Sequence, residues 1–194
     1  MDTAEGAGGR NWDRLWQGKT CLFLWAAAAA AYGFSLWAGL AFLSPVPFLL
    51  LLGLAALEDW DTGYISDGWS LLLAVTGLIS AWARQDVAAG ILSAALCFLV
   101  YFLLYMISRK SLGTGDILLS TAAAFWLAPV SCLFFIWLSA VTAALALGAA
   151  ALAGGAGIGR EVRFGPFIAL GGVAAYGLEK TGLLFVLTAW LLAG

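Results

Sequence analysis

Two short acidic stretches carry the residue types that could do chemistry in this chain. One runs from Glu58 to Asp67 and reads Glu-Asp-Trp-Asp-Thr-Gly-Tyr-Ile-Ser-Asp, and the other is Gly-Thr-Gly-Asp at 113–116. A pair of carboxyl groups can hydrolyse a peptide bond when the ionised one takes a proton from water and the protonated one donates to the scissile carbonyl oxygen. Two carboxyl groups close together repel each other strongly when both are ionised, so such a pair is expected to share a proton.

Each stretch also has an ordinary structural interpretation. The first could end a helix and face solvent in a loop, and for Asp61 and Asp67 considered alone this interpretation is favoured. Asp116 could simply cap the helix that follows it, because Asp is a preferred N-cap residue and complements the helix dipole. Gly113 and Gly115 would allow tight turns and the close approach of another segment. Taken separately, neither stretch specifies an enzyme.

The composition predicts that these residues belong to a membrane protein. Of the 194 residues, 63% are hydrophobic and only 10% are charged, against roughly 25% charged residues in an average soluble domain. The mean hydropathy of +0.99 agrees. A soluble protein of this size would need far more polar surface to cover its core.

Several classes of function are excluded by the same counts. The chain has no His, which rules out a Ser-His-Asp triad, a Cys-His pair and an HExxH zinc site. A net charge of -2 offers no basic surface for nucleic acid. Cys21, Cys97 and Cys132 lie far apart in apolar segments without a CxxC pattern, so each is expected to be a small buried hydrophobe. Neither a metal nor a cofactor is expected.

The apolar segments predict an all-α fold, a polytopic transmembrane helix bundle with about 6–8 spans, since about 20 residues cross the hydrocarbon. We expect residues 1–19 to form an N-terminal tail with an interfacial helix and residues 20–194 to form the transmembrane domain. The last segment is either one long tilted span or two short ones broken at Glu179-Lys180. The expected segments are 20–42, 46–58, 69–83, 87–107, 116–129, 130–152 and 165–193.

The basic residues predict the orientation of these spans. With the N-terminus inside, only Arg84 and (if the last segment breaks) Lys180 fall on the outer side. Both acidic stretches are then expected at the cytoplasmic face of the membrane, although they are far apart in sequence. The basic residues that fall on the cytoplasmic side are Arg10, Arg14, Lys19, Arg109, Lys110, Arg160 and Arg163.

Together the two stretches resemble the type IV prepilin peptidases, the bacterial GxGD aspartic proteases of the membrane. Asp59 lies six residues before Ile65-Ser66-Asp67, where that family usually has Ile/Leu-Pro-Asp/Asn, and Asp116 completes the GxGD motif. A third stretch, Phe-Gly-Pro-Phe-Ile-Ala-Leu-Gly-Gly at 164–172, is similar to the family's FGPF/Y-L-A segment. The resemblance covers roughly residues 46–175 and implies that Asp59 and Asp116 are the catalytic pair, supported by Gly113 and Gly115.

The chain departs from that family's pattern in three places. Ser66 replaces the usual proline, and Leu118 stands where many members have Lys. The cytoplasmic insert with paired CxxC motifs that larger members carry is missing from this sequence. The chain therefore resembles a minimal peptidase core, and nothing in it supports an additional N-methyltransferase activity.

The resemblance implies that the enzyme removes the basic leader peptide of type IV prepilins or pseudopilins, cutting after a Gly that precedes an apolar helix. Glu58, Asp61 and Asp67 are candidate contacts for that leader. We expect residues 154–163 to be a connector rather than a flap. Since Asp59 would end a helix and Asp116 would begin one, the helix dipoles predict that Asp59 is the protonated acid and Asp116 the resting base.

Other interpretations of the same residues stay open. The acids could serve as a proton relay in a small transporter, although transporters usually place such groups near the midplane and contain repeats. A catalytically inactive homologue is a second alternative. A Ser/Lys dyad of Lys110 with Ser108 or Ser111 is a rival protease mechanism, disfavoured because a hydrated loop would not lower the pKa of that lysine.

Overall fold

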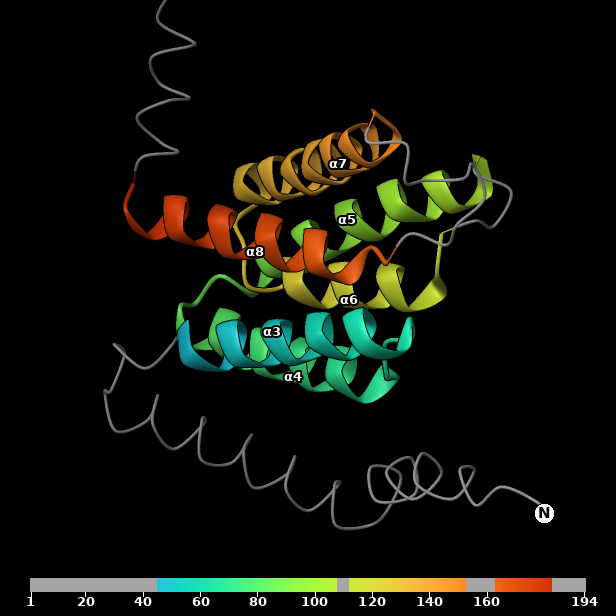
Figure 1. Ribbon diagram of the computed structural model, residues 1–194. Coiled ribbons are helices and arrows are strands. Elements are labelled where there is room, and N and C mark those ends of the chain that lie inside the picture. The colour runs from blue at the N-terminus through green and yellow to red at the C-terminus, as the bar shows by residue number, and fades with distance from the viewer. Residues whose placement is uncertain (1–44, 108–111, 153–162, 183–194) are drawn as a thin grey trace, which may run out of the picture. The chain divides into compact units, whose positions relative to one another are not determined.

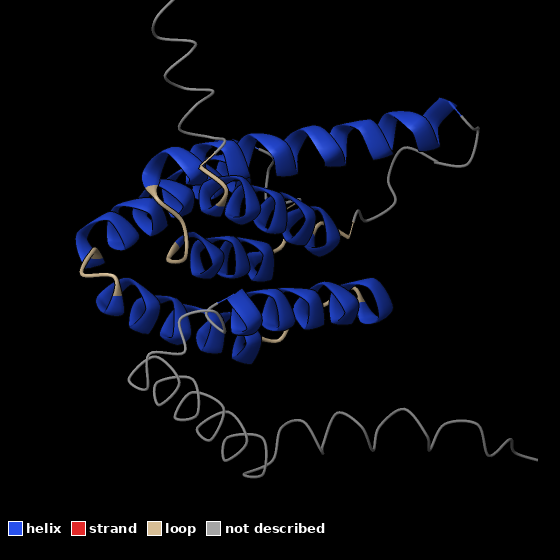
Figure 2. Ribbon diagram, turned by 90° about the vertical axis from the view of Figure 1, so that its left-hand side faces the viewer, coloured by secondary structure: helices blue, strands red, loops and turns tan. Residues whose placement is uncertain are grey.

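The computed structural model describes residues 45–107, 112–152 and 163–182, all within one compact unit, Ser44–Gly194. In this part of the chain every regular element is a helix, as Figure 2 shows, which confirms the all-α prediction. Two stretches, Val87–Ile107 and Pro129–Ala149, are long and apolar enough to cross a membrane. The helices are α3 (Pro45–Thr62), α4 (Asp67–Ala83), α5 (Val87–Ile107), α6 (Thr114–Ala124), α7 (Pro129–Leu152) and α8 (Gly165–Lys180) (Figure 1).

The sequence located α4, α5 and α7 to within two residues, but its boundary for α3 was wrong. This helix continues into the first acidic stretch as far as Thr62, where a loop beginning at Glu58 was expected. The reason is that no residue before Gly63 breaks the helix. Gly63 takes a φ of +70°, which glycine adopts readily at a helix end, and its N–H donates to the Asp59 carbonyl at 2.8 Å.

The boundaries of α6 were also predicted incorrectly. It begins at Thr114 and ends at Ala124, whereas the sequence suggested a segment from 116 to 129. Gly113 is the N-cap, with φ −69° and ψ 142°, so Asp116 lies inside the first turn rather than at the cap. Eleven residues are too few to cross a membrane alone, which makes α6 a short helix that depends on its neighbours.

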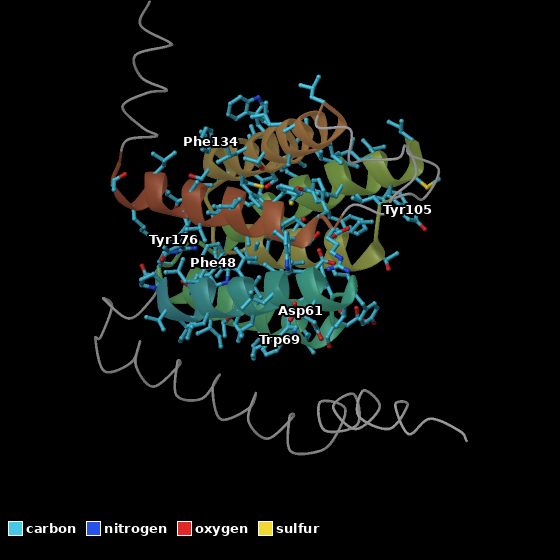
Figure 3. The ribbon with its side chains drawn as sticks, viewed as in Figure 1. Phe48, Asp61, Trp69, Tyr105, Phe134 and Tyr176 are labelled. Atoms are coloured by element: carbon cyan, nitrogen blue, oxygen red, sulfur yellow. The ribbon has the colours of Figure 1, made fainter. Side chains whose placement is uncertain are left out.

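An aromatic cluster packs α3 and α8 against the turn that follows α6. The Phe48 and Tyr176 rings stack with their centroids 4.9 Å apart, and the Trp126 ring lies 5.4 Å from Phe48. Figure 3 shows Phe48 and Tyr176 facing each other between the two helices, well away from Asp61 at the other end of α3. The Trp126 indole N–H donates to the Leu73 carbonyl at 3.0 Å, which ties α4 to the same cluster.

Several predictions concern residues outside the described part of the chain. These are the interfacial tail at 1–19, the span at 20–42, the connector at 154–162 and the Ser/Lys candidates at 108–111. The helix α8 ends at Lys180, as the broken alternative for the last segment required, and the chain after 182 is outside the description. Cys97 and Cys132 are buried free thiols, as predicted, while Cys21 lies outside.

Candidate active site

Asp59 is a buried carboxylate on the last turn of α3. Only 5% of the residue is exposed, and its Oδ2 accepts a hydrogen bond of 2.8 Å from the backbone N–H of Gly165. Because Gly165 is the first residue of α8, this carboxylate lies at a helix N-terminus. A Cβ on Gly165 would lie 2.8 Å from both Cβ and Oδ2 of Asp59, so the contact requires glycine.

Asp116 is the second buried carboxylate, on the first turn of α6, with 8% of the residue exposed. Its backbone carbonyl accepts a hydrogen bond of 2.6 Å from the buried Ser120 hydroxyl. A Cβ on Gly113 would lie 3.0 Å from Asp116 Oδ2. The first glycine of the GxGD motif therefore leaves room for the carboxylate beside it.

The other motif glycine brings the two acidic stretches into contact. A Cβ on Gly115 would lie 3.2 Å from Cβ of Ile65 and 3.4 Å from its carbonyl oxygen. Ile65 is in the short connection between α3 and α4 and is only 4% exposed. Figure 1 shows the end of α3 and the starts of α6 and α8 at the same side of the bundle. Residues about 50 and 100 positions apart thus form one site.

The electrostatics distinguish the two carboxyl groups, which lie outside the two helices of membrane-spanning length. Burial and, to a smaller extent, the charge of Asp59 raise the pKa of Asp116 to about 7, against the opposing hydrogen bond from the Gly113 backbone N–H. Burial also raises the pKa of Asp59, but the Gly165 N–H and the Arg163 charge oppose that rise. The structure therefore favours a protonated Asp116 beside an ionised Asp59.

This assignment is the reverse of the one that the helix dipoles suggested. The dipole argument counted only the helix that carries each residue. Asp59 does end α3, but its side chain also meets the N-terminus of α8, whose N–H groups stabilise an anion.

Comparison with known proteins identifies the family. Residues 46–148, slightly more than half of the chain and including Asp59 and Asp116, match the model of the type IV leader peptidase family. The chain belongs to this family. A relative from Escherichia coli, the type 4 prepilin-like proteins leader peptide-processing enzyme, is 32% identical over 85 residues. That match covers 40% of this chain and about a third (32%) of the relative's length. No solved structure matches the chain.

The remaining acids of this leader peptidase family member differ in their surroundings. Glu58 is partly buried, and its Oε2 accepts a hydrogen bond of 2.9 Å from the Ser66 N–H. Asp61 and Asp67 are exposed, and Asp61 is seen near the end of α3 in Figure 3. Of the three candidate leader contacts, Glu58 therefore has a structural partner, while Asp61 and Asp67 stay predictions.

The sequence analysis did not predict the roles of two site residues, Gly165 and Arg163. Gly165 was recognised only as part of a motif, and the ordinary interpretation of a Gly-Pro turn opening the last helix is correct. Its N–H contact with Asp59 joins positions 106 residues apart, which no local pattern reveals. Arg163 was treated as part of a connector, yet its charge acts on Asp59.

The described residues contain no group of three or more His, Cys, Asp or Glu side chains that could hold a metal ion. What they offer is two carboxyl groups in different electrostatic environments at one end of the bundle. Such a pair can act on water and a carbonyl group together.

Proposed function

We propose that this chain is a membrane aspartic endopeptidase that removes the leader peptide of type IV prepilins or pseudopilins. In this proposal it cuts after Gly, at the cytoplasmic face of the bacterial inner membrane. Family membership and the name of the Escherichia coli relative support the substrate class. The observation that carries the mechanism is the pair Asp59 and Asp116, both buried, with the Gly165 N–H on the first and a pKa of about 7 on the second.

The chemistry follows from the different environments of the two groups. Ionised Asp59 takes a proton from a water molecule, and the resulting hydroxide adds to the scissile carbonyl carbon. Protonated Asp116 donates a hydrogen bond, then its proton, to the carbonyl oxygen, which stabilises the tetrahedral intermediate. When the C–N bond breaks, Asp59 gives the proton it took from water to the leaving amine. The hydroxyl formed at the former carbonyl oxygen returns its proton to Asp116, so the pair again holds one proton.

The proposed topology suits a substrate whose apolar helix lies in the lipid bilayer. A leader at the cytoplasmic end of such a helix would reach the depth of Asp59 and Asp116. The exposed side chains of Asp61 and Asp67 would attract its basic residues, although single exposed ion pairs contribute little. The proposal involves no metal, cofactor or nucleic acid.

Cleavage of a prepilin with a Lys/Arg-rich leader ending in Gly, read by mass spectrometry, tests the proposal. The purified chain should release the leader after Gly, and Asp59→Asn or Asp116→Asn should each abolish the release. Asp86→Asn is the matched control, because Asp86 is an exposed acid beyond the far end of α4. Its substitution should leave cleavage unchanged.

Other outcomes would reject parts of the proposal. Cleavage that survives both substitutions would move catalysis to other residues, such as the Ser/Lys candidates at 108–111. Absence of cleavage by the unmodified chain, across several pilins, would favour an inactive homologue or a transporter.

A further inference from the structure

The connection between α3 and α4 contains only residues 63–66. Hydrogen bonds hold its backbone to residues in the last turns of α3. Thr62 Oγ1 donates to the Glu58 carbonyl at 2.8 Å and accepts the Tyr64 N–H at 3.1 Å. Farther along the connection, the Ser66 N–H donates to Glu58 Oε2 at 2.9 Å. The Glu58 side chain therefore spans the connection and fixes its last residue.

Ser66 is the N-cap of α4, with φ −66° and ψ 130°, and its side chain makes no capping hydrogen bond. In its contact with Glu58, Ser66 uses its backbone N–H as the donor. A proline would adopt the same φ but has no N–H to donate.

The fixed connection lies against the second acidic stretch. Ile65, directly before Ser66, is buried against Gly115, where a Cβ would meet the Ile65 carbonyl oxygen at 3.4 Å. Gly115 directly precedes Asp116, and Glu58 directly precedes Asp59. A shift of the connection would therefore change the position of one carboxyl group relative to the other.

We infer that Glu58 is a positioning residue. By accepting a hydrogen bond from the Ser66 N–H, it holds Ile65 against Gly115 and so fixes the position of Asp59 relative to Asp116. This inference rests on the proposed function, since it concerns the geometry of the proposed catalytic pair. It replaces the role of leader contact that the charge of Glu58 suggested. A leader contact would need the negative charge, whereas the positioning role needs a hydrogen-bond acceptor.

The inference predicts a specific coupling between positions 58 and 66. In the sequence pattern that this chain resembles, proline stands at the position of Ser66. In an S66P variant the ring would fix φ, and Glu58 would have no N–H to accept. Ile65 lies outside the helices, so a following proline does not interrupt one. Loss of the Glu58 side chain should then lower the rate of cleavage when residue 66 is serine, and should not lower it when residue 66 is proline.

The experiment measures kcat and KM of prepilin cleavage for the full chain and for E58A, E58Q, S66P and E58A/S66P in lipid nanodiscs. Loss of a charge-assisted hydrogen bond should lower kcat of E58A about tenfold with KM unchanged. E58Q keeps an acceptor and should stay within about threefold of the unmodified chain. E58A/S66P should match S66P within about twofold, since the two positions are coupled.

A second readout does not depend on activity. Amide hydrogen exchange of the 63–67 segment should be faster in E58A than in the unmodified chain and in E58Q. If wild-type cleavage failed but this difference appeared, the proposed function would be rejected, and the hydrogen bond by which Glu58 fixes the connection would be retained. Equal exchange in E58A and the unmodified chain, or a rise in KM shared by E58A and E58Q, would overturn the positioning role.

Discussion

At one end of α8 the carboxylate of Asp59 accepts the Gly165 N–H at 2.8 Å, and at the other end Glu179 Oε2 accepts the Ala128 N–H at 2.9 Å. Both bonds connect a carboxylate to the backbone of a distant segment. We call the first region, with Asp59 and Asp116, the site end, and the second, around the 125–128 turn, the far end. The two ends differ in what surrounds the carboxylate.

At the far end the charged groups complete a short turn between α6 and α7. Arg84 Nη1 donates to the Trp126 carbonyl at 3.1 Å, while Glu179 accepts from Ala128 two residues later. The Lys180 ammonium lies 5.2 Å from the centroid of the Tyr176 ring. Arg84 and Glu179 thus satisfy backbone groups of this turn, beside the aromatic cluster.

At the site end two carboxyl groups influence each other instead. Burial and then the Asp59 charge raise the pKa of Asp116, whereas the rise that burial causes in the pKa of Asp59 is opposed by the Gly165 N–H and the Arg163 charge. A carboxylate bonded to a backbone N–H is therefore structural at one end and part of a titrating pair at the other. The difference lies in the second carboxyl group, not in the hydrogen bond.

The largest effect should come from filling the space at the Asp59 contact. A Cβ on Gly165 would overlap the Asp59 side chain, whereas Gly177 of the same helix has nothing within 4 Å of its added Cβ. Gly165→Ala should lower kcat/KM at least about hundredfold, because the displaced carboxylate loses its alignment. Gly177→Ala should keep full activity and stabilise the fold by up to about 1 kcal/mol. Equal activity of the two variants would mean that Gly165 does not position Asp59.

The second prediction concerns pH. In the proposed mechanism Asp116 donates a proton, so activity should fall as pH rises through about 7, by about tenfold per pH unit well above it. Folded Asp116 also binds its proton more tightly than the unfolded chain does. The free energy of unfolding should therefore decrease as pH rises from about 4 to about 7.

Thermal unfolding of the unmodified chain and of Asp116→Asn across this range checks the stability part. The decrease should be smaller in Asp116→Asn, because Asn does not titrate. An identical pH dependence in both proteins would show that Asp116 is not the group with the raised pKa.

A smaller effect, on stability alone, is expected at the far end. Glu179→Ala leaves the partly buried Ala128 N–H without its acceptor, which should cost about 1–3 kcal/mol in the free energy of unfolding. Denaturant unfolding measures this change, with Glu179→Gln as the control that keeps an acceptor. Activity per folded molecule should not change. A large loss of kcat in Glu179→Ala would contradict the interpretation that the far end has a structural role alone.

The smallest effect should come from the exposed acids of the site end. Asp61→Asn and Asp67→Asn each remove one solvated charge, and KM for a basic leader should rise about two- to threefold at low salt. Raising the ionic strength should remove this difference, because exposed charges are screened. A change in kcat instead of KM would place these acids in the chemical step.

The sequence was sufficient where a physical signal was local. Continuous apolar runs of about 20 residues located α5 and α7, and the resemblance to the prepilin peptidases indicated Asp59 and Asp116 as the candidate pair. Local signals failed to predict the end of α3, where residues typical of a loop lie within a segment that forms a helix. The acids at the end of α3 suggested a loop from Glu58, but the helix continued to Thr62, directly before Gly63.

By itself, then, the sequence determined the helical class and the membrane character, because composition and apolar runs are properties of neighbouring residues. Its resemblance to a known family indicated which two acids to consider. Only the tertiary structure decided how the acids differ. Gly165 meets Asp59 across 106 residues, and this contact places an anion-stabilising helix start beside a residue whose own helix end disfavours an anion. Burial and long-range contacts set the pKa of each group, and neither exists before the chain folds.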